Sequence, residues 1–302
     1  KNSPINILFK LNEKKNKINI NDLGFLIGPI LNAGGRLGKS QYATELLSSS
    51  NDLVVNDRSK SLIKLNDKRK EIENLILEEI DFKKIEKENK DVIIYYNPNI
   101  NEGLIGIIAA RLKDYFNKPS FVITASNELL KGSARSIYNY NIGRLIKNSL
   151  DKNIIINGGG HNMAAGFTLD KVNLKDFENY ILEDFFKSNI SHDNIFSYES
   201  EVSSLALNQD FYEDLKKLEP FGTGNPVPTF MLRDLRIIKP IVLNNKHISV
   251  ILKSKTGFSI KSISFNTINT MIGEHLMSYK NNINVIGQIG ENIWNNKKTL
   301  QL

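Results

Sequence analysis

Three consecutive glycines followed by a histidine, within "INGGGHNMAAGFTLD" at residues 156–170, form the stretch of this sequence best suited to chemistry. Gly159 and Gly160 offer backbone N–H groups that no side chain hinders, and successive groups of this kind can form an anion-binding nest. His161 follows directly and can donate a hydrogen bond to a phosphate oxygen. The pattern predicts a turn that holds a phosphate group; a tight turn with a packed histidine is the alternative.

Two arginines also stand beside small residues. In "KGSARSI", Ser133 and Arg135 are two positions apart, which on a β-strand places both side chains on one face. A hydroxyl next to a guanidinium suits a phosphate group, and a solvated strand face is the alternative. In "NAGGRLG", Arg36 follows two glycines, so we expect a sharp backbone turn that presents this arginine to a ligand. A turn without a ligand is the alternative.

The sequence lacks the patterns of a self-contained metal-dependent hydrolase. Its histidines, at positions 161, 192, 247 and 275, do not have metal-ligand spacing, and the "HDN" at 192–194 falls in a polar segment that we expect to be a linker. There is no P-loop, and the absence of cysteine excludes disulfides and thiolate metal sites. These features predict a polypeptide that holds a substrate and has no metal site of its own.

Composition places the chain among globular proteins of two or three domains. It has 302 residues, of which 40% are hydrophobic and 24% charged. The net charge of +7 fits a polyanionic partner, but the excess is spread thinly, and a bias toward Lys, Asn and Ile explains it equally well. Without a membrane-length apolar run or a signal peptide, we expect a cytoplasmic protein. The sequence begins with Lys1, as a piece of a longer protein would.

Apolar spacing predicts the elements that position these residues. A charged helix is expected from about residue 57 to residue 88, capped by Asn56 or Asp57 and connecting two domains. Its apolar stripe consists of Leu62, Leu65, Ile72, Ile76 and Ile80. Residues 91–190 alternate between strand and helix patterns and predict an α/β unit. The expected strands are "DVIIYY", "SFVITA", "LLKGSARSI" and "AAGFTL", and the expected helices lie at "LIGIIAARLKDYF", 142–150 and 173–187.

The last hundred residues have a different pattern. After a polar linker around residues 190–198, short strand patterns alternate with turn residues, which favours a small barrel of the OB type. A helix is expected at "QDFYEDLKKL". The predicted strands are "SYESEVSSLAL", "TFMLRDLRIIKPIVL", "HISVILKS", "FSIKSISF", "NINVIGQIG" and "KTLQL".

Five motifs in a fixed order make the sequence recognisable. They are "LGFLIGPILNAGGRLG", "NEGLIGIIAARL", "KGSARSI", "GGGHNMAAGFTL" and "LEPFGTGNPVPTF". Together they resemble the RecJ family of single-stranded-DNA-specific exonucleases, in the DHH phosphoesterase superfamily, from about residue 20 to the end. One departure is Asn101, where the family usually has a histidine before Glu102.

The resemblance implies a fold class and a domain order. The fold class is α/β plus all-β. Residues 1–55 would be the C-terminal end of a DHH domain, 56–90 a connecting helix, 91–190 a DHHA1 substrate-binding domain and 195–302 an OB-fold barrel that binds nucleic acid. In the family, two divalent cations, Mn or Mg, are bound by Asp and Asp-His-His motifs of a preceding domain. Those motifs have no counterpart in this sequence.

The resemblance also implies roles for the candidate residues. The intact enzyme would hydrolyse single-stranded DNA from the 5′ end to mononucleotides, in DNA repair and recombination. The implied roles are catalytic for His161 and substrate phosphate binding for Arg36, Ser133, Arg135, Gly159 and Gly160. Single-stranded DNA would contact the OB-fold through some of Lys253, Lys255, Phe258, Lys261 and Trp294.

This chain would supply DNA and phosphate binding without the metal centre, and by itself it is expected to be inactive. The alternatives are another DHH/DHHA1 phosphoesterase that acts on short oligonucleotides, and a non-catalytic module that binds single strands. The "FGTGNP" loop followed by a barrel favours the RecJ family over the first alternative.

Overall fold

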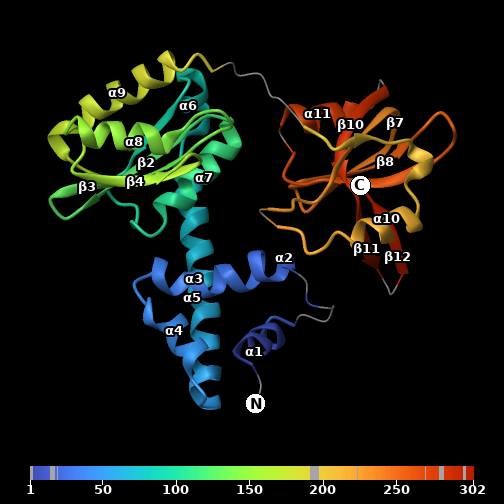
Figure 1. Cartoon of the computed structure of the whole chain (residues 1–302), viewed down its shortest axis with the longest axis horizontal. Helices are drawn as coiled ribbons and strands as arrows, with labels where there is room; N and C mark the ends of the chain where they lie inside the picture. The colour runs from blue at the N-terminus through green and yellow to red at the C-terminus, as the bar shows by residue number, and fades with distance from the viewer. Residues whose placement is uncertain are drawn as a thin grey trace. The chain divides into compact units, whose positions relative to one another are not determined.

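The computed structural model describes residues 3–13, 18, 20–190, 197–222, 224–268, 270–278, 282–294 and 297–302. The chain divides into two compact units, Lys1–His192 and Asp193–Leu302. The first combines helices with a five-stranded sheet, and the second is built on a seven-stranded sheet (Figure 1). The predicted succession of an α/β part and an all-β part is confirmed.

Short helices open the first unit and pack against its longest helix. They are α1 (Pro4–Leu11), α2 (Ile20–Asp22), the π-helical turn η1 (Leu23–Ile27), α3 (Gly28–Arg36) and α4 (Gln41–Ser48). Leu8, Ile30 and Leu46 are fully buried in the apolar cluster that these helices share with the long helix. Burying these side chains holds α3 in place.

The sharp turn predicted before Arg36 is wrong. Gly34 and Gly35 lie inside α3, which ends at Arg36, and the chain reverses only around Gly38, with a φ of +77°. A Cβ at Gly34 would lie 2.6 Å from the carbonyl oxygen of Lys39, so glycine is required there for packing. A helix, rather than a loop, therefore sets the position of Arg36.

The long helix α5 (Asp52–Glu79) joins two apolar clusters (Figure 1). It begins after Asn51, whose side chain accepts a hydrogen bond of 2.9 Å from a backbone N–H of the first turn. The predicted apolar stripe is confirmed. Leu62 packs in the cluster with α1, α3 and α4, and Ile76 packs in the second cluster, which α5 shares with the sheet.

The predicted helix from residue 57 to residue 88 ends at Glu88 as expected, but its predicted start is wrong and the segment is two helices rather than one. Asn56 and Asp57, the expected caps, are interior positions of α5. The helix stops at Glu79 because the side chain of Asp81 accepts a hydrogen bond of 2.9 Å from the backbone N–H of Lys84 and so starts a new helix, α6 (Phe82–Glu88).

The sheet of the first unit has the strand order β1-β2-β3-β5-β4. β1 and β2 are parallel neighbours, and the other neighbours are antiparallel. The expected strands and helices of residues 91–190 are all present. The elements are β1 (Ile93–Tyr96), α7 (Ile105–Phe116), β2 (Ser120–Ser126), β3 (Leu129–Arg135), α8 (Ile142–Asp151), β4 (Asn157–His161), β5 (Ala164–Asp170), the 3-10 turn η2 (Lys171–Asn173) and α9 (Leu174–Lys187).

The two faces of this sheet are covered differently. On one face, α8 and α9 pack over Phe121 and Phe167 in a large apolar cluster. On the other face, α7 packs over β1 and β2 and also contacts β3. Farther along, the second face is exposed at Gly166 and Gly159. This part is called the open face; it consists of Lys131, Ser133 and Arg135 on β3, Ala164, Gly166 and Thr168 on β5, and Asn157, Gly159 and His161 on β4.

The glycine run is a strand, so the predicted phosphate-binding turn is wrong. Residues 157–161 form β4 at the edge of the sheet, paired antiparallel with β5. In the part of the chain that the structure describes, positive-φ glycines occur only at Gly38 and Gly257. An anion-binding nest depends on a left-handed residue beside a right-handed one, and the run has no such residue.

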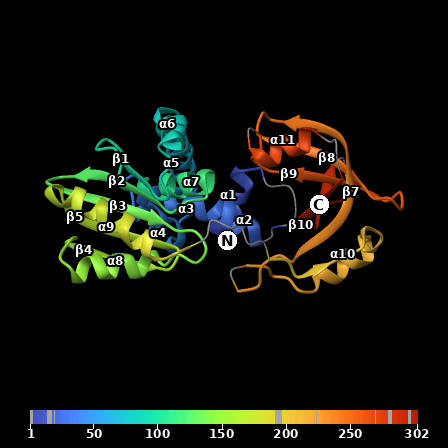
Figure 2. The ribbon, with the colours of Figure 1, turned by 90° about the horizontal axis from the view of Figure 1, so that it is seen from above.

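The second unit is a strongly curved sheet with the order β10-β7-β8-β9-β12-β11, and β6 pairs with β7. The long strand β7 bends along its length (Figure 2), where its register with β8 shifts between Ile238 and Ile241. The elements are β6 (Ser200–Glu201), the 3-10 turn η3 (Ser204–Ala206), α10 (Gln209–Lys216), β7 (Thr229–Leu243), β8 (His247–Lys253), β9 (Ser259–Ser264), α11 (Met271–Ser278), β10 (Asn282–Gln288), β11 (Gly290–Trp294) and β12 (Lys297–Gln301).

Several predictions for the second unit need correction. The stretch expected as a strand at "SYESEVSSLAL" contains only the two-residue β6, followed by η3. Helix α11 and strand β11 were not predicted. The expected linker and the "HDN" at 192–194 lie largely or wholly outside the described residues. None of the described helices combines the length and the apolar character needed to cross a lipid bilayer.

Candidate functional site

Ser133 and Arg135 lie side by side on the open face, against the first turn of α7. Arg135 Nη1 donates hydrogen bonds to Ser133 Oγ at 3.1 Å and to the carbonyl oxygen of Ala134 at 2.9 Å. A Cβ at Gly106, in that turn, would lie 3.0 Å from Arg135 Nη2 and 3.1 Å from Ser133 Oγ. The N-terminal end of a helix dipole favours anions, as does the guanidinium beside it.

Arg36 approaches the start of α7 from α3. Its Nη1 donates a hydrogen bond of 2.9 Å to the carbonyl oxygen of Gly103. A Cβ at Gly103 would lie 2.2 Å from the carbonyl oxygen of Arg36, so the close approach requires glycine there. Burial and then the charge of Arg36 lower the pKa of Arg135, which shows that the two cations repel each other. The structure therefore brings Arg36, Ser133 and Arg135 together.

Arg36 also interacts with a third arginine, Arg69 of α5. Burial has the largest effect on the pKa of Arg36 and lowers it; the charge of Arg69 lowers it further, and Glu73 partly offsets both. Arginine stays protonated in proteins, so Arg36 is a partly buried cation with a second cation, Arg69, close by. Such a cluster is stabilised when an anion binds.

A single buried carboxylate organises the arginines of this region. Glu73 Oε2 accepts a hydrogen bond of 2.8 Å from Arg69 Nη1, and Oε1 accepts one of 2.7 Å from Arg111 Nε. The Glu73 side chain is 6% exposed and that of Arg69 is 12% exposed. The sequence alone does not single out Arg69 and Glu73, because an Arg–Glu pair four residues apart on a charged helix has the pattern of an ordinary surface ion pair.

Strand register places His161 on the same open face as Arg135. His161 is opposite Ala164 of β5, and Ala164 is opposite Arg135 of β3. Directly opposed residues share a face, and neighbouring strands lie about 4.8 Å apart, so the backbones of His161 and Arg135 are about 10 Å apart. His161 is exposed. The structure thus aligns it with the arginine without a direct contact.

Two glycines of the open face are not required for packing. Gly159 is opposite Gly166, which is in turn opposite Ser133. A Cβ at Gly159 would meet no atom within 4 Å, and one at Gly166 would meet only the carbonyl oxygen of Gly132 at 3.8 Å. The bare backbone at these positions forms a shelf beside Ser133 that a ligand can approach closely.

Gly160, by contrast, is explained by the fold. A Cβ there would lie 2.3 Å from the carbonyl oxygen of Ala164 and 2.5 Å from the Cα of Ala165. Of the two glycines predicted to contact phosphate, only Gly159 lies on the open face.

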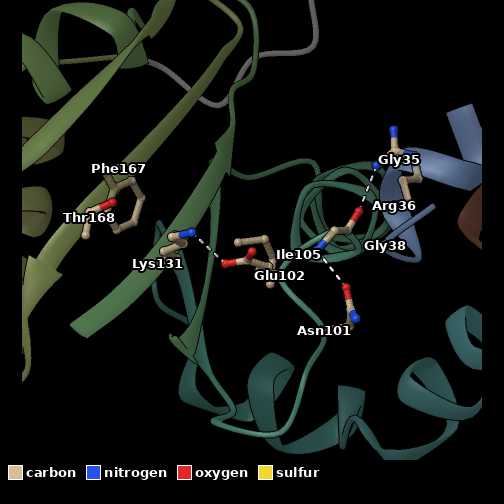
Figure 3. A pocket seen from close by; sticks show the side chains of 11 residues that line it. Gly35, Arg36, Gly38, Asn101, Glu102, Ile105, Lys131, Phe167 and Thr168 are labelled. Atoms are coloured by element: carbon tan, nitrogen blue, oxygen red, sulfur yellow. Dashed lines mark hydrogen bonds and ion pairs between the residues drawn. The ribbon is translucent and has the colours of Figure 1, made fainter. Parts of the chain in front are cut away.

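A pocket of about 510 Å³ lies beside Arg36 (Figure 3). Arg36 lies at one side of the pocket and Thr168 at the other. Between these two residues, Lys131 Nζ and Glu102 Oε2 form an ion pair of 2.7 Å. Lys131 and the hydroxyl of Ser126 lower the pKa of Glu102. The pocket is therefore polar and contains both charges. Ser133, Arg135 and His161 do not line it.

The second unit has a basic face of its own. Lys253 of β8 is opposite Arg236 of β7, and Lys261 of β9 is opposite Ile251, two positions from Lys253 on the same side of the sheet. All three basic side chains are exposed, and none pairs with a carboxylate of a described residue. Arg236 was not among the sequence-based candidates, because only the strand register shows which basic residues share a face.

The other candidates of the second unit fit a nucleic-acid contact less well. Lys255 forms an ion pair with Asp234, which neutralises its charge. Phe258 packs against the apolar cluster inside the unit. The side chain of Trp294 lies outside the described part of the structure.

A mixed sheet with one covered and one cationic face, followed by a curved, mostly antiparallel sheet, matches two known domain families. The DHHA1 domain family matches residues 89–188, and the RecJ OB domain family matches residues 198–302. The first match includes the whole five-stranded sheet, and the second includes every described strand of the second unit.

Curated proteins that match most of the chain include RecJ exonucleases. The chain is 32% identical over 283 residues to the single-stranded-DNA-specific exonuclease RecJ of Haemophilus influenzae, covering 87% of this chain and 49% of that protein. It is 27% identical over 290 residues to RecJ of Bacillus subtilis, covering 93% of this chain and 36% of that protein. The chain therefore spans about half, or less, of the curated relatives it matches.

Solved structures give the same result for the fold. RecJ of Thermus thermophilus in complex with Mg²⁺ matches 98% of this chain with a TM-score of 0.77 at 22% identity, and the match covers 45% of that protein. The Mn²⁺ complex of the same protein gives a TM-score of 0.78. The resemblance to RecJ is confirmed: the chain corresponds to a portion of RecJ that contains the DHHA1 and OB domains.

Proposed function

We propose that this chain is the DNA-holding part of a RecJ-type 5′–3′ exonuclease, which hydrolyses single-stranded DNA to mononucleotides in DNA repair and recombination. The observation that carries the proposal is the convergence of three side chains on the start of α7: Arg36 binds the carbonyl oxygen of Gly103 just before the helix, and Ser133 and Arg135 lie against Gly106 in its first turn. Crowded cations at a helix N-terminus favour a phosphate group. The similarity to RecJ supplies the substrate class.

Each open-face residue has a separate task in this proposal. Arg135 and Ser133 bind a backbone phosphate, and the shelf at Gly159 lets the strand lie close to the sheet. His161 contacts the phosphate that reacts and offsets the charge that develops on it. In the second unit, the basic face containing Lys253 and Lys261 holds the rest of the single strand through charge.

The metal centre of the intact enzyme belongs elsewhere. The Thermus thermophilus RecJ structures contain Mg²⁺ or Mn²⁺, and we infer that the intact enzyme uses two such divalent cations. Among the described residues, no group of three or more His, Cys, Asp or Glu side chains could hold a metal ion. We also propose that residues 1–55 belong to the end of the metal-binding DHH domain and that α5 and α6 correspond to the connecting helix predicted at 56–90. The resemblance to RecJ places the metal-binding motifs in a preceding part of the enzyme.

Binding of a 5′-phosphorylated oligonucleotide to this chain tests the proposal. Arg135→Met should weaken binding about tenfold or more, because a hydrogen-bonded charge is lost. Arg144→Met is the matched control: Arg144 lies on α8, on the covered side of the sheet, and its side chain is 56% exposed. Equal effects of the two variants, measured by fluorescence anisotropy over a range of salt concentrations, would contradict the proposed site.

The role of His161 is tested in the full-length enzyme. We expect His161→Ala to lower single-turnover hydrolysis about 10²–10³-fold, the usual cost of losing one donor to a transition-state charge. Oligonucleotide affinity should change much less. An unchanged single-turnover rate would remove His161 from the chemistry and leave the phosphate-binding proposal intact.

A further inference from the structure

A second, smaller cavity shares Arg36 with the pocket in Figure 3. It has a volume of about 180 Å³ and lies where η1 and α3 meet α5 and α7. Arg36 and Arg69 both line it, together with Asn32. Its volume is roughly that of six water molecules, which is enough for a phosphate group. Arg36 therefore lines two cavities, and Arg69 lines only the smaller one.

The walls of this cavity are bare where helices normally carry side chains. Gly24 of η1 lines it, and a Cβ at Gly24 would meet no atom within 4 Å. The same is true of Gly35, which lines the larger pocket next to Arg36. A glycine inside a helix costs about 1 kcal/mol relative to alanine. At both positions, no contact within the described part of the chain requires glycine.

Arg69 is fixed so that it can meet a ligand without rearranging. Its Nη1 is bound to Glu73 and its Nε to the side-chain oxygen of Asn66 at 3.2 Å. Glu73 also binds Arg111, so this single carboxylate is shared between two guanidinium groups. Its negative charge does not balance Arg69 and Arg36 together, and the cavity between them favours an anion.

We propose that Arg69 and Asn32, with Arg36 as the shared member, form a second binding position for a backbone phosphate. It lies next to the position at Ser133 and Arg135, and the two would take neighbouring phosphates of one strand. Arg36 would then bridge both phosphates. This inference rests on the proposed function, because the ligand is the phosphate backbone of single-stranded DNA.

The test couples a protein change to a change in the DNA. The probe is a 5′-phosphorylated oligothymidylate in which one linkage at a time is replaced by a neutral methylphosphonate. Arg69→Met should weaken binding of the unmodified probe about tenfold or more. When the neutral linkage occupies the position that Arg69 contacts, the variant should cause no further loss. Arg135→Met should show this coupling at a different phosphate.

Arg111→Met is the matched control. It removes the same charge and also a partner of Glu73, but Arg111 is not among the residues that line the cavity, and its side chain is 56% exposed. It should show no coupling to any linkage. If Arg69→Met does not fold, as judged by circular dichroism, Asn32→Ala at an exposed position of α3 takes its place.

The outcomes separate the two proposals. If Arg135→Met weakens binding but neither Arg69→Met nor Asn32→Ala couples to any linkage, the second position is wrong and the proposed function stands. If the unmodified chain does not distinguish the phosphorylated oligonucleotide from an uncharged probe of the same length, the proposed function itself fails. Coupling of Arg69 and Arg135 to the same linkage would reduce the two positions to one.

Discussion

The two faces of the five-stranded sheet use glycine for opposite reasons. On the covered face, glycines make room for neighbouring atoms: a Cβ at Gly132 would lie 2.0 Å from the ring of Phe167, its partner on β5. On the open face, Gly159 and Gly166 face space. The first kind of glycine is explained by the fold. The second kind is not, and it lies beside Ser133, where we place the ligand.

Glycine content alone does not mark a binding site. In the run at 158–160 the side-chain direction alternates along β4, so its members face different sides of the sheet. Gly158 and Gly160 touch the covered side, and Gly159 does not. Substitutions at neighbouring positions of the run should therefore have different effects on stability and on DNA binding.

The largest effect is expected from Gly160→Ala. The new Cβ would collide with backbone atoms of β5, which cannot move without breaking the strand pairing. We expect the first unit to lose about 3 kcal/mol of stability. Urea unfolding followed by circular dichroism measures this change, and the single tryptophan at position 294 reports separately on the second unit. A variant as stable as the parent would show that the two faces do not differ in this way.

Gly132→Ala should cost less, about 2 kcal/mol. The atoms that its Cβ would meet belong to the side chain of Phe167, whose ring can shift by a small amount within the cluster. The same urea titration measures the change. Combining Gly132→Ala with Phe167→Leu should recover part of the loss, and no recovery would mean that the ring is not what requires glycine.

Gly159→Val should leave stability unchanged or slightly raised while weakening DNA binding. Valine favours strands, and nothing lies within 4 Å of its Cβ. Its side chain would cover the shelf between β3 and β4, so we expect roughly a tenfold loss of affinity for a 5′-phosphorylated oligonucleotide, about the effect of one lost phosphate contact. Unchanged binding by fluorescence anisotropy would show that the strand does not approach this shelf.

The smallest effect concerns the ion pair of Lys131 and Glu102 beside the open face. Lys131 lowers the pKa of Glu102, so the pair stabilises the fold above the usual carboxyl pKa, and this contribution is lost as the pH falls through the lowered value. Both side chains are about half exposed, which limits the contribution to about 0.5 kcal/mol. In Lys131→Met, an NMR titration should show the pKa of Glu102 rising toward its usual value, and an unchanged pKa would exclude the pair.

Local patterns were sufficient to predict most elements of the fold. The alternation along β3 and the stripe from Leu62 to Ile76 are predicted correctly, because each reflects a burial pattern repeated along one element. The predictions are wrong where residues distant in the sequence determine the local backbone conformation. Arg36 was expected in a turn because its two glycines suggested one, whereas α3 uses Gly34 to approach Lys39.

The candidate site was predicted in part for the same reason. Ser133 and Arg135 were recognised because two-residue spacing on a strand is a local property. Arg69 and Glu73 were missed because their importance comes from the packing of α5 beside α3 and α7, elements that are distant from it along the chain.

Local patterns in the sequence predicted most of the helices and strands, and the order of its motifs indicated the resemblance to RecJ. Only the tertiary structure shows at which glycines an added side chain would collide with neighbouring atoms and at which it would not. It also shows which arginines lie together at the start of α7. The physical reason is the distance along the chain over which each property is set. Periodicity records burial within one element, whereas the field of converging charges and the space beside a glycine depend on elements that only folding brings together.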